Sequence, residues 1–180
     1  MHGVIFAQLK KYADTKVGGD AWNHMRTAAG LGSRAYFSVQ KYPDEELGAL
    51  VAAASKLTGK PVTALLEDFG EFLVPELVRM YRSIIPAEWT ALDLIEQTES
   101  RIHRVVRMND AAASPPELRV RRLSPTSVLL DYRSPRRLCA VAKGIARGVG
   151  AHYNERLIIE ERRCMHTGAP ACEIVISRAA

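Results

Sequence analysis

The sequence has almost none of the features that mark secreted, disulfide-stabilised or membrane-spanning proteins. Its 180 residues include only three cysteines, an odd number that does not suit a disulfide framework. No apolar run approaches the roughly 20 residues needed to cross a bilayer. The first residues, MHGVIFAQLKKYAD, lack a basic region before the apolar ones and a small-residue cleavage site. We therefore expect one cytoplasmic domain with no membrane segment, whose cysteines are thiols or metal ligands.

Acidic residues are scarce in part of the second half of the chain. Residues 1–90 hold ten basic and ten acidic side chains, whereas Arg119 to Arg147 hold eight Lys or Arg and one acidic residue, Asp131. The net charge of +5 therefore arises in the second half. No nucleic-acid-binding motif accompanies the arginines, so we expect no nucleic acid partner and instead an acidic protein or a cofactor's carboxylates. Arg119, Arg121 and Arg122 are expected to form a solvated strand edge.

The hydrophobic pattern changes period at Pro115-Pro116. Before the prolines the apolar residues recur at helical spacing, and after them they alternate as in strands around a Ser124-Pro125 turn and a Thr167-Gly168 turn. A helical pattern over 136–154 separates the two hairpins. We predict an α+β fold for a single domain, 1–180. It has a helical N-terminal subdomain over about 1–112, then a C-terminal subdomain of antiparallel hairpins with one intervening helix over about 113–180.

The stretch DYRSPRR places donors at every second position. If a strand continues through it, Tyr132, Ser134 and Arg136 line up on one face, and Pro135 confines them to a strand end or edge. Two hydroxyls and a guanidinium with no carboxylate beside them suit an anionic, oxygen-rich group. A planar guanidinium can bind a carboxylate through two parallel hydrogen bonds.

His103 lies on the apolar face of a helix predicted over 89–108. It is eight residues after Ile95 and three before Val106, so its ring is expected to be at least partly buried. One interpretation is a core histidine with its nitrogens bonded to the backbone. The other is a metal ligand, because a neutral imidazole facing an apolar cavity is how a proximal histidine holds haem iron. A haem would use both features, since its iron needs an axial nitrogen and its propionates need paired donors.

Taken together, these features resemble the H-NOX family, the haem nitric oxide and oxygen binding domains related to the sensor domain of soluble guanylate cyclase. The resemblance covers essentially the whole chain, from MHGVIF through His103 and the two prolines to the Y-x-S-x-R motif. It implies a haem b buried between the two subdomains, with His103 as the proximal iron ligand. The motif residues Tyr132, Ser134 and Arg136 would hold the propionates. Pro116 would press on the porphyrin, with Ile5 nearby.

The resemblance also predicts which gas is bound. Family members that keep oxygen have a distal tyrosine five residues after the motif arginine, supported by a tryptophan and an asparagine. The matching positions here are Val141, Leu9 and Leu73 or its neighbour Val74, all apolar. Bound dioxygen needs a polar donor, whereas nitric oxide binds ferrous haem tightly without one. We expect nitric oxide, and also carbon monoxide, to bind, and little stable oxygen complex to form.

By resemblance, the chain is a stand-alone bacterial sensor rather than an enzyme. Nitric oxide would break the bond between iron and His103, the haem would relax toward planarity, and the subdomains would shift. The signal would then pass to a partner, and for the bacterial relatives this suggests a histidine kinase or a cyclic-di-GMP enzyme.

The cysteines suggest a second site, in which three thiols would be joined by one of Glu161, His166 or His152 around a zinc ion. The three are Cys139, Cys164 and Cys172. Their spacing is not that of a usual zinc knuckle, and free buried thiols are the alternative. A subset of H-NOX domains carries the same cysteines but has a histidine where this chain has Glu161, so the fourth ligand is open. Loss of zinc would expose oxidisable thiolates.

Three other functions are compatible with parts of the sequence. A haem peroxidase or oxygenase would need a polar distal pocket, which the apolar distal positions argue against. A haem-free small-molecule-binding module of the 4-vinyl reductase type would share the C-terminal hairpin and leave His103 as a core residue. A zinc or thiol redox sensor would depend on the cysteines alone.

Overall fold

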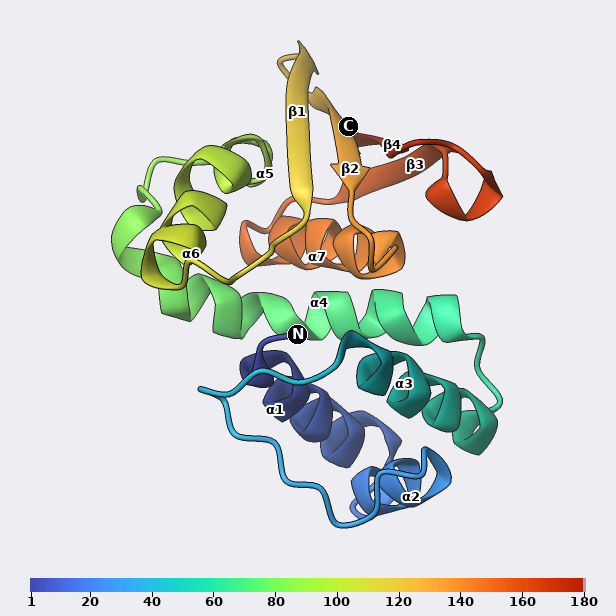
Figure 1. Ribbon diagram of the computed structural model, residues 1–180. Coiled ribbons are helices and arrows are strands. Elements are labelled where there is room, and N and C mark those ends of the chain that lie inside the picture. The colour runs from blue at the N-terminus through green and yellow to red at the C-terminus, as the bar shows by residue number, and fades with distance from the viewer. Residues whose placement is uncertain (180) are drawn as a thin grey trace. The chain divides into compact units, whose positions relative to one another are not determined.

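The computed structural model describes residues 1–179, which form two compact units, 1–69 and 70–179 (Figure 1). The first unit contains α1 (Gly3–Tyr12), the π-helical segment η1 (Ala13–Val17), α2 (Ala21–Ala28), α3 (Asp44–Thr58) and the start of α4 (Val62–Tyr81). The second contains the end of α4, η2 (Arg82–Ile84), α5 (Ala91–Gln97), η3 (Thr98–His103), α6 (Arg104–Asn109), β1 (Glu117–Ser124), β2 (Ser127–Arg133), α7 (Cys139–His152), β3 (Leu157–Arg163), η4 (Met165–Thr167) and β4 (Cys172–Arg178). Strands begin after Pro115-Pro116, but the compact units divide earlier, inside α4.

An aromatic cluster organises the first unit. Phe6 of α1 stacks on Tyr36 with ring centroids 4.4 Å apart and meets Tyr42 edge-on at 5.4 Å. The Tyr36 hydroxyl donates to the buried carboxylate of Glu46, 2.7 Å away, and Arg34 lies 3.1 Å from the same carboxylate. Because the buried charge is paired and hydrogen-bonded, its burial costs less. The long connection between α2 and α3 is thereby held against α1.

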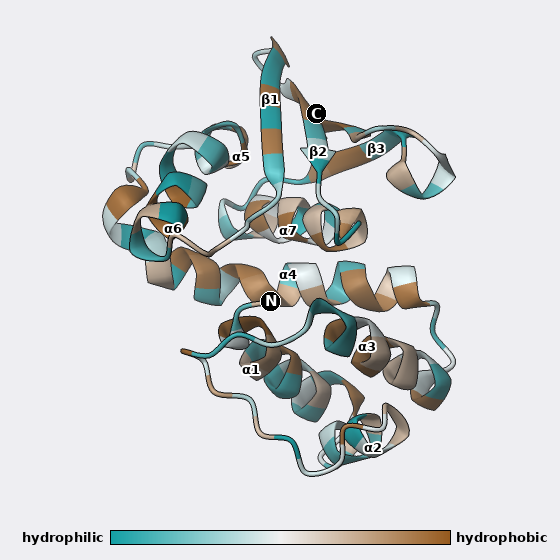
Figure 2. Ribbon diagram, in the orientation of Figure 1, coloured by the Kyte–Doolittle hydropathy of each residue, from teal (hydrophilic) through white to brown (hydrophobic). Residues whose placement is uncertain are grey.

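The second unit is built on a four-stranded antiparallel sheet in the order β1-β2-β4-β3. The two predicted hairpins, β1–β2 and β3–β4, join through the pairing of β2 with β4. Figure 2 shows hydrophilic and hydrophobic residues alternating along β1, as a sheet with one covered face requires. The predicted α+β class, with one helix between two hairpins, is confirmed.

The core of this unit lies between the sheet and its helices. Val128 and Leu130 of β2 lie opposite Ile176 and Ile174 of β4 in the strand register, and all four are buried. Leu92 of α5 belongs to the same core cluster. Burying each such side chain contributes roughly 1.5–3 kcal/mol. This core fixes the positions of α5 and β2, the two elements that lead to His103 and to the Tyr-Ser-Arg motif.

Charged residues interrupt the apolar sequence of the longest helix, α4. Its 20 residues include Glu67, Asp68, Glu71, Glu76 and Arg79. Among residues 1–179, no helix is long and apolar enough to cross a membrane.

Glycines allow α4 and α7 to approach closely within the second unit. A Cβ on Gly70 would lie 2.3 Å from the carbonyl oxygen of Val141, and one on Gly148 would lie 2.6 Å from a methyl group of Val74. Neither position has room for a side chain. The backbone of Val141, a predicted distal position, therefore packs directly against Gly70.

Replacing Gly70 by alanine is expected to destabilise the protein. The new methyl group would meet a backbone carbonyl that cannot move freely, and we expect a loss of about 1–3 kcal/mol in the free energy of unfolding. Gly48→Ala is the matched control, because a Cβ there has nothing within 4 Å in the exposed middle of α3. It should stabilise by up to about 1 kcal/mol. Urea denaturation of both variants measures the two changes, and equal effects would contradict this account.

Candidate functional site

His103 ends a π-helical segment and not a continuous α-helix. The helix predicted over 89–108 is instead α5, then η3 with π-type hydrogen bonding, then α6. A π-helical segment changes the direction of the residues that follow it, and such segments are frequent at functional sites. The side chain of His103 is 13% exposed. The expected burial is present, but the local geometry differs from a regular amphipathic helix.

The ring of His103 is held by a carboxylate. Its Nδ1 lies 2.8 Å from Oε2 of Glu99, one turn earlier. Burial lowers the pKa of His103 and the nearby Arg107 guanidinium lowers it further, while the bond to Glu99 opposes the shift. The imidazole is therefore neutral at pH 7, the form that binds metals. With Nδ1 bonded to Glu99, Nε2 is the ring nitrogen suited to a metal.

The Tyr-Ser-Arg motif is formed by a strand end and a turn. β2 ends at Arg133, so the expected continuation of the strand through Arg136 is wrong. The amide of Arg137 donates to the Ser134 carbonyl at 3.1 Å, which closes a turn with Pro135 at its second position, where proline is favoured. The Ser134 hydroxyl accepts from the Arg136 amide at 3.2 Å. Turn chemistry, rather than strand alternation, thus places Arg136 near Ser134.

The hydroxyl-bearing residues of the motif are buried. Tyr132 is 3% exposed and Ser134 is 2% exposed. Burial raises the pKa of the Tyr132 phenol, although hydrogen bonds with Ser134 and the Leu138 backbone oppose the shift. The phenol is therefore a neutral hydrogen-bond donor at physiological pH.

The segment before β1 joins the motif to the histidine. Arg136 donates through Nη1 to the carbonyl of Ser114. A backbone hydrogen bond with Pro116 raises the pKa of His103. His103 and Arg136 thus both contact one short segment, 114–116. Of the predicted distal residues, Leu73 is buried on α4 and Val141 is half-buried on α7 in the same unit. Ile5 and Leu9 lie on α1 in the first unit.

The donor set of the second unit fits a haem. One neutral, largely buried imidazole has a nitrogen suited to iron, and two buried hydroxyls with a guanidinium suit carboxylates.

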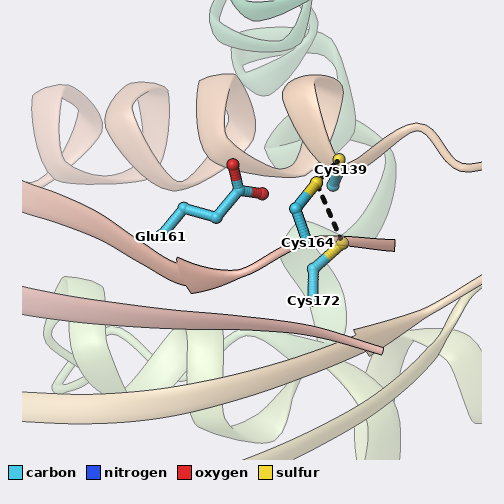
Figure 3. A group of neighbouring side chains, drawn as sticks. All are labelled: Cys139, Glu161, Cys164 and Cys172. Atoms are coloured by element: carbon cyan, nitrogen blue, oxygen red, sulfur yellow. Dashed lines mark hydrogen bonds between the residues drawn. The ribbon is translucent and has the colours of Figure 1, made fainter. Parts of the chain in front are cut away.

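The three cysteines meet Glu161 in a separate cluster of the second unit (Figure 3). The Sγ atom of Cys164 is 3.8 Å from that of Cys139 and 3.9 Å from that of Cys172. The four ligand atoms all lie within 4.8 Å of one another. His166 is directed elsewhere, because its Nε2 lies 2.8 Å from the carbonyl oxygen of Arg137.

Two further residues bear on the composition of the cysteine cluster. His152 is exposed and ends α7, whereas Cys139 begins it. Lys143 lies 3.3 Å from the Glu161 carboxylate. Three sulfurs and one carboxylate oxygen make a suitable tetrahedral set for zinc, with Lys143 competing for the oxygen.

Comparisons with known proteins agree with this geometry. A family model described as haem-NO-binding matches residues 2–161. The chain belongs to the H-NOX family. An H-NOX protein from S. oneidensis in the Fe(II)NO ligation state has 27% identity, a TM-score of 0.92 and coverage of 100% of both chains. An H-NOX domain from Shewanella oneidensis in the Fe(II)CO state has 28% identity, a TM-score of 0.87 and coverage of 99% of both chains.

Among curated proteins, soluble guanylate cyclase gcy-31 of Caenorhabditis elegans is 23% identical over 145 residues. The match takes in 76% of this chain but spans only 20% of the cyclase. The relation to guanylate cyclases is therefore distant. The chain is an H-NOX haem gas-binding sensor domain of a non-catalytic family, which favours haem binding over the haem-free module.

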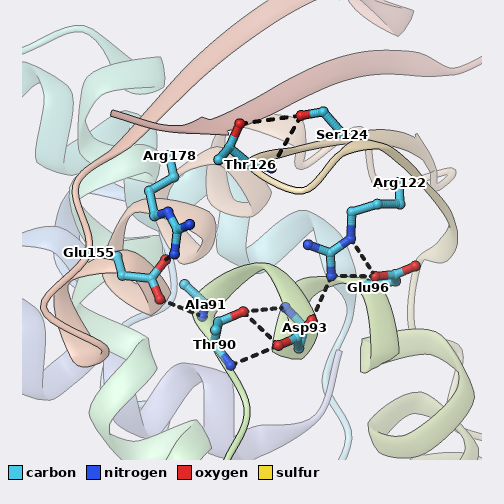
Figure 4. A network of polar contacts seen from close by, with 9 residues as sticks. All are labelled: Thr90, Ala91, Asp93, Glu96, Arg122, Ser124, Thr126, Glu155 and Arg178. Carbon is cyan, nitrogen blue, oxygen red and sulfur yellow. Dashed lines mark hydrogen bonds and ion pairs between the residues drawn. The ribbon is translucent and has the colours of Figure 1, made fainter. Parts of the chain in front are cut away.

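A polar network that the sequence did not predict fastens α5 of this H-NOX domain to the sheet (Figure 4). Thr90 and Asp93 form a capping box at the start of α5. Arg122 of β1 lies 2.6 Å from both Asp93 and Glu96. The prediction of a solvated edge is thus wrong for Arg122, which is only 29% exposed. Its place in the alternation of β1, two residues after the partly buried Val120, is the signal that could have identified it.

The same network reaches the C-terminal strand. Glu155 accepts from the Ala91 amide at 3.4 Å and lies 3.9 Å from Arg178 of β4. The start of the helical stretch that carries His103 is therefore tied to both β1 and β4.

Asp93→Asn should destabilise the H-NOX domain at neutral pH but not in acid. The Thr90 hydroxyl and amide, together with Arg122, hold the pKa of Asp93 below its usual value against the effect of burial. A lowered pKa means that the stabilisation is complete above the unfolded-state value, near 3.9. It is lost as the pH falls through the lower folded-state pKa.

We expect the free energy of unfolding to fall by about 0.5–1 kcal/mol at pH 7, a small effect because solvent screens the partly exposed Asp93, and the difference should shrink below about pH 4. Denaturant unfolding of wild type and Asp93→Asn at several pH values measures it. Asp131→Asn, on a strand of the same unit, controls for loss of one negative charge. If the difference in the free energy of unfolding between wild type and Asp93→Asn did not change with pH, the lowered pKa of Asp93 would be contradicted.

Proposed function

We propose that the chain is a nitric oxide sensor that binds haem b with His103 as the axial ligand. The observation that supports this most directly is the state of His103, which is neutral, largely buried and fixed through Nδ1. A bound ferrous haem would supply the iron that coordinates the gas and would use His103 as its protein ligand. The role of the protein is to orient that histidine and to respond to its release.

Tyr132, Ser134 and Arg136 are proposed to bind the propionates. The burial of both hydroxyl-bearing residues and the turn that places Arg136 near Ser134 support this role. Pro116, whose backbone hydrogen bond raises the pKa of His103, is proposed to press on the porphyrin. Ile5 is proposed, from its family position, to contact the porphyrin as well.

Selectivity for nitric oxide is proposed to come from an apolar distal wall. The family positions that bear polar residues in oxygen-binding members are Leu9, Leu73 and Val141 here. None of these side chains can donate a hydrogen bond to bound dioxygen, so the oxygen complex should be weak. Carbon monoxide, which is also apolar, should bind. Relatives in the Fe(II)NO and Fe(II)CO states show that this family accommodates both ligands.

The signal is proposed to leave through a partner protein. Release of His103 would free the η3 segment, and the resulting shift would change a surface that a histidine kinase or a cyclic-di-GMP enzyme recognises. The family assignment supports a sensor role, and the partner's class rests on resemblance to bacterial members.

Absorption spectra of the reduced protein test this proposal. We expect a Soret band of five-coordinate, histidine-ligated ferrous haem, a shift to shorter wavelength with nitric oxide, and no change with oxygen. His103→Gly should lose the histidine-ligated spectrum and regain it when imidazole is added. His152→Gly, which removes an exposed histidine at the end of α7, should keep the wild-type spectrum. A stable oxygen complex would contradict the proposed distal wall.

We also propose that the cysteine cluster binds zinc, with Glu161 as the fourth ligand. The supporting observation is the convergence of three sulfurs and one carboxylate within 4.8 Å. Loss of zinc would leave thiols that oxidants can modify, which would give the sensor a redox input.

Zinc titration of the metal-free protein, followed by native mass spectrometry, tests the zinc site. One zinc per chain is expected, and Cys164→Ser should abolish it. Glu161→Ala should weaken zinc affinity by about 10-fold or more. Glu160→Ala is the matched control, because it removes a carboxylate from the preceding residue of β3, which lies outside the cluster. Equal zinc affinity in both glutamate variants would exclude Glu161 as a ligand.

A further inference from the structure

Glu99 makes more contacts than a helix-surface glutamate usually does. Its Oε2 lies 2.8 Å from Nδ1 of His103 and accepts from the backbone amide of Leu118 at 3.2 Å. Its Oε1 accepts from Nη2 of Arg107. One carboxylate therefore joins His103, the helix after it and the second residue of β1.

The sheet continues this connection from Leu118. In the strand register Leu118 lies opposite Tyr132 of β2, and Tyr132 lies opposite Cys172 of β4. One cross-strand row thus starts at the amide that Glu99 binds, passes the proposed propionate residue and ends in the cysteine cluster.

We propose that Glu99 is the positioning residue for His103, which fixes the ring and links its movement to β1. This inference rests on the proposed ligation of iron by His103. A carboxylate that accepts from Nδ1–H selects the tautomer with Nε2 free for the metal and makes the imidazole a stronger electron donor. If His103 were released from iron, the same hydrogen bond would transmit the displacement of the ring to the Leu118 amide.

Arg107 moderates this effect. Its guanidinium shares the carboxylate with the imidazole, so it withdraws electron density that Glu99 would otherwise supply to Nδ1. Removing Arg107 and removing Glu99 should therefore change the donor strength of His103 in opposite directions. A purely structural role of Glu99 would not produce this pair of opposite changes.

The test is resonance Raman spectroscopy of the ferrous haem-loaded protein, which measures the iron–histidine stretching frequency, together with the midpoint potential. The frequency should decrease in the order wild type, Glu99→Gln, Glu99→Ala, and the midpoint potential should rise in the same order. Haem transfer to excess apomyoglobin should be about 10- to 100-fold faster in Glu99→Ala. Arg107→Gln should raise the frequency above that of wild type.

Glu96→Gln is the matched control. It removes a carboxylate three residues earlier that binds Arg122 and not His103, so its frequency should equal that of wild type. The inference is overturned if Glu99→Ala shifts the frequency no more than Glu96→Gln does, or if Glu99→Ala does not fold and Arg107→Gln leaves the frequency unchanged. An absent iron–histidine band in the wild type would instead refute the proposed ligation by His103.

Discussion

A buried histidine that is to bind a metal must have its ring held through the other nitrogen, and several contacts of the second unit meet that requirement. Glu99 binds Nδ1 of His103, and a backbone hydrogen bond with Pro116 raises the pKa of the same ring. Both partners are constrained in turn, Glu99 by Arg107 and the amide of Leu118, and Pro116 by its place just before β1. The chain can therefore keep a neutral imidazole in one orientation without burying an unpaired charge.

That arrangement depends on the sheet being in a fixed register. If β1 slipped by one residue, every side chain would change faces, and Leu118 would no longer lie opposite Tyr132. The capping box at Thr90 and the bonds of Arg122 to Asp93 and Glu96 oppose such a slip, because they fasten α5 to a particular residue of β1. The polar contacts of Arg122 and the buried apolar residues thus specify the same register.

The sequence predicted the parts of the fold that depend on periodicity. The two hairpins, the helix between them and the α+β class follow from alternation and turn residues, and the family resemblance, which rests on His103 and the Y-x-S-x-R spacing, was confirmed. It did not predict η3, because π-type hydrogen bonding has no clear sequence signal. The inward position of Arg122 was missed because an arginine was assumed to be solvated. The role proposed for Glu99 was missed, although His103 and Arg107 follow it by four and eight residues along the chain. Its third partner, the amide of Leu118, is 19 residues away and is set by a tertiary contact that the sequence does not reveal.

The basic segment from Arg119 to Arg147 contributes differently to the folded structure than its sequence suggests. Of its eight cations, four lie beside carboxylates from outside the segment, namely Arg119 beside Glu117, Arg122 beside Asp93 and Glu96, Lys143 beside Glu161, and Arg147 beside Glu71. Three of these four pairs join different elements of the second unit, and the pair of Arg119 with Glu117 lies within β1. Half of the cations in the segment are thus paired with carboxylates. Arg136 differs from these four, because its guanidinium donates to the backbone carbonyl of Ser114, while its backbone amide donates to the hydroxyl of buried Ser134. A guanidinium on the turn that follows two buried hydroxyl-bearing residues suits carboxylates supplied by a bound molecule, which is what two propionates require.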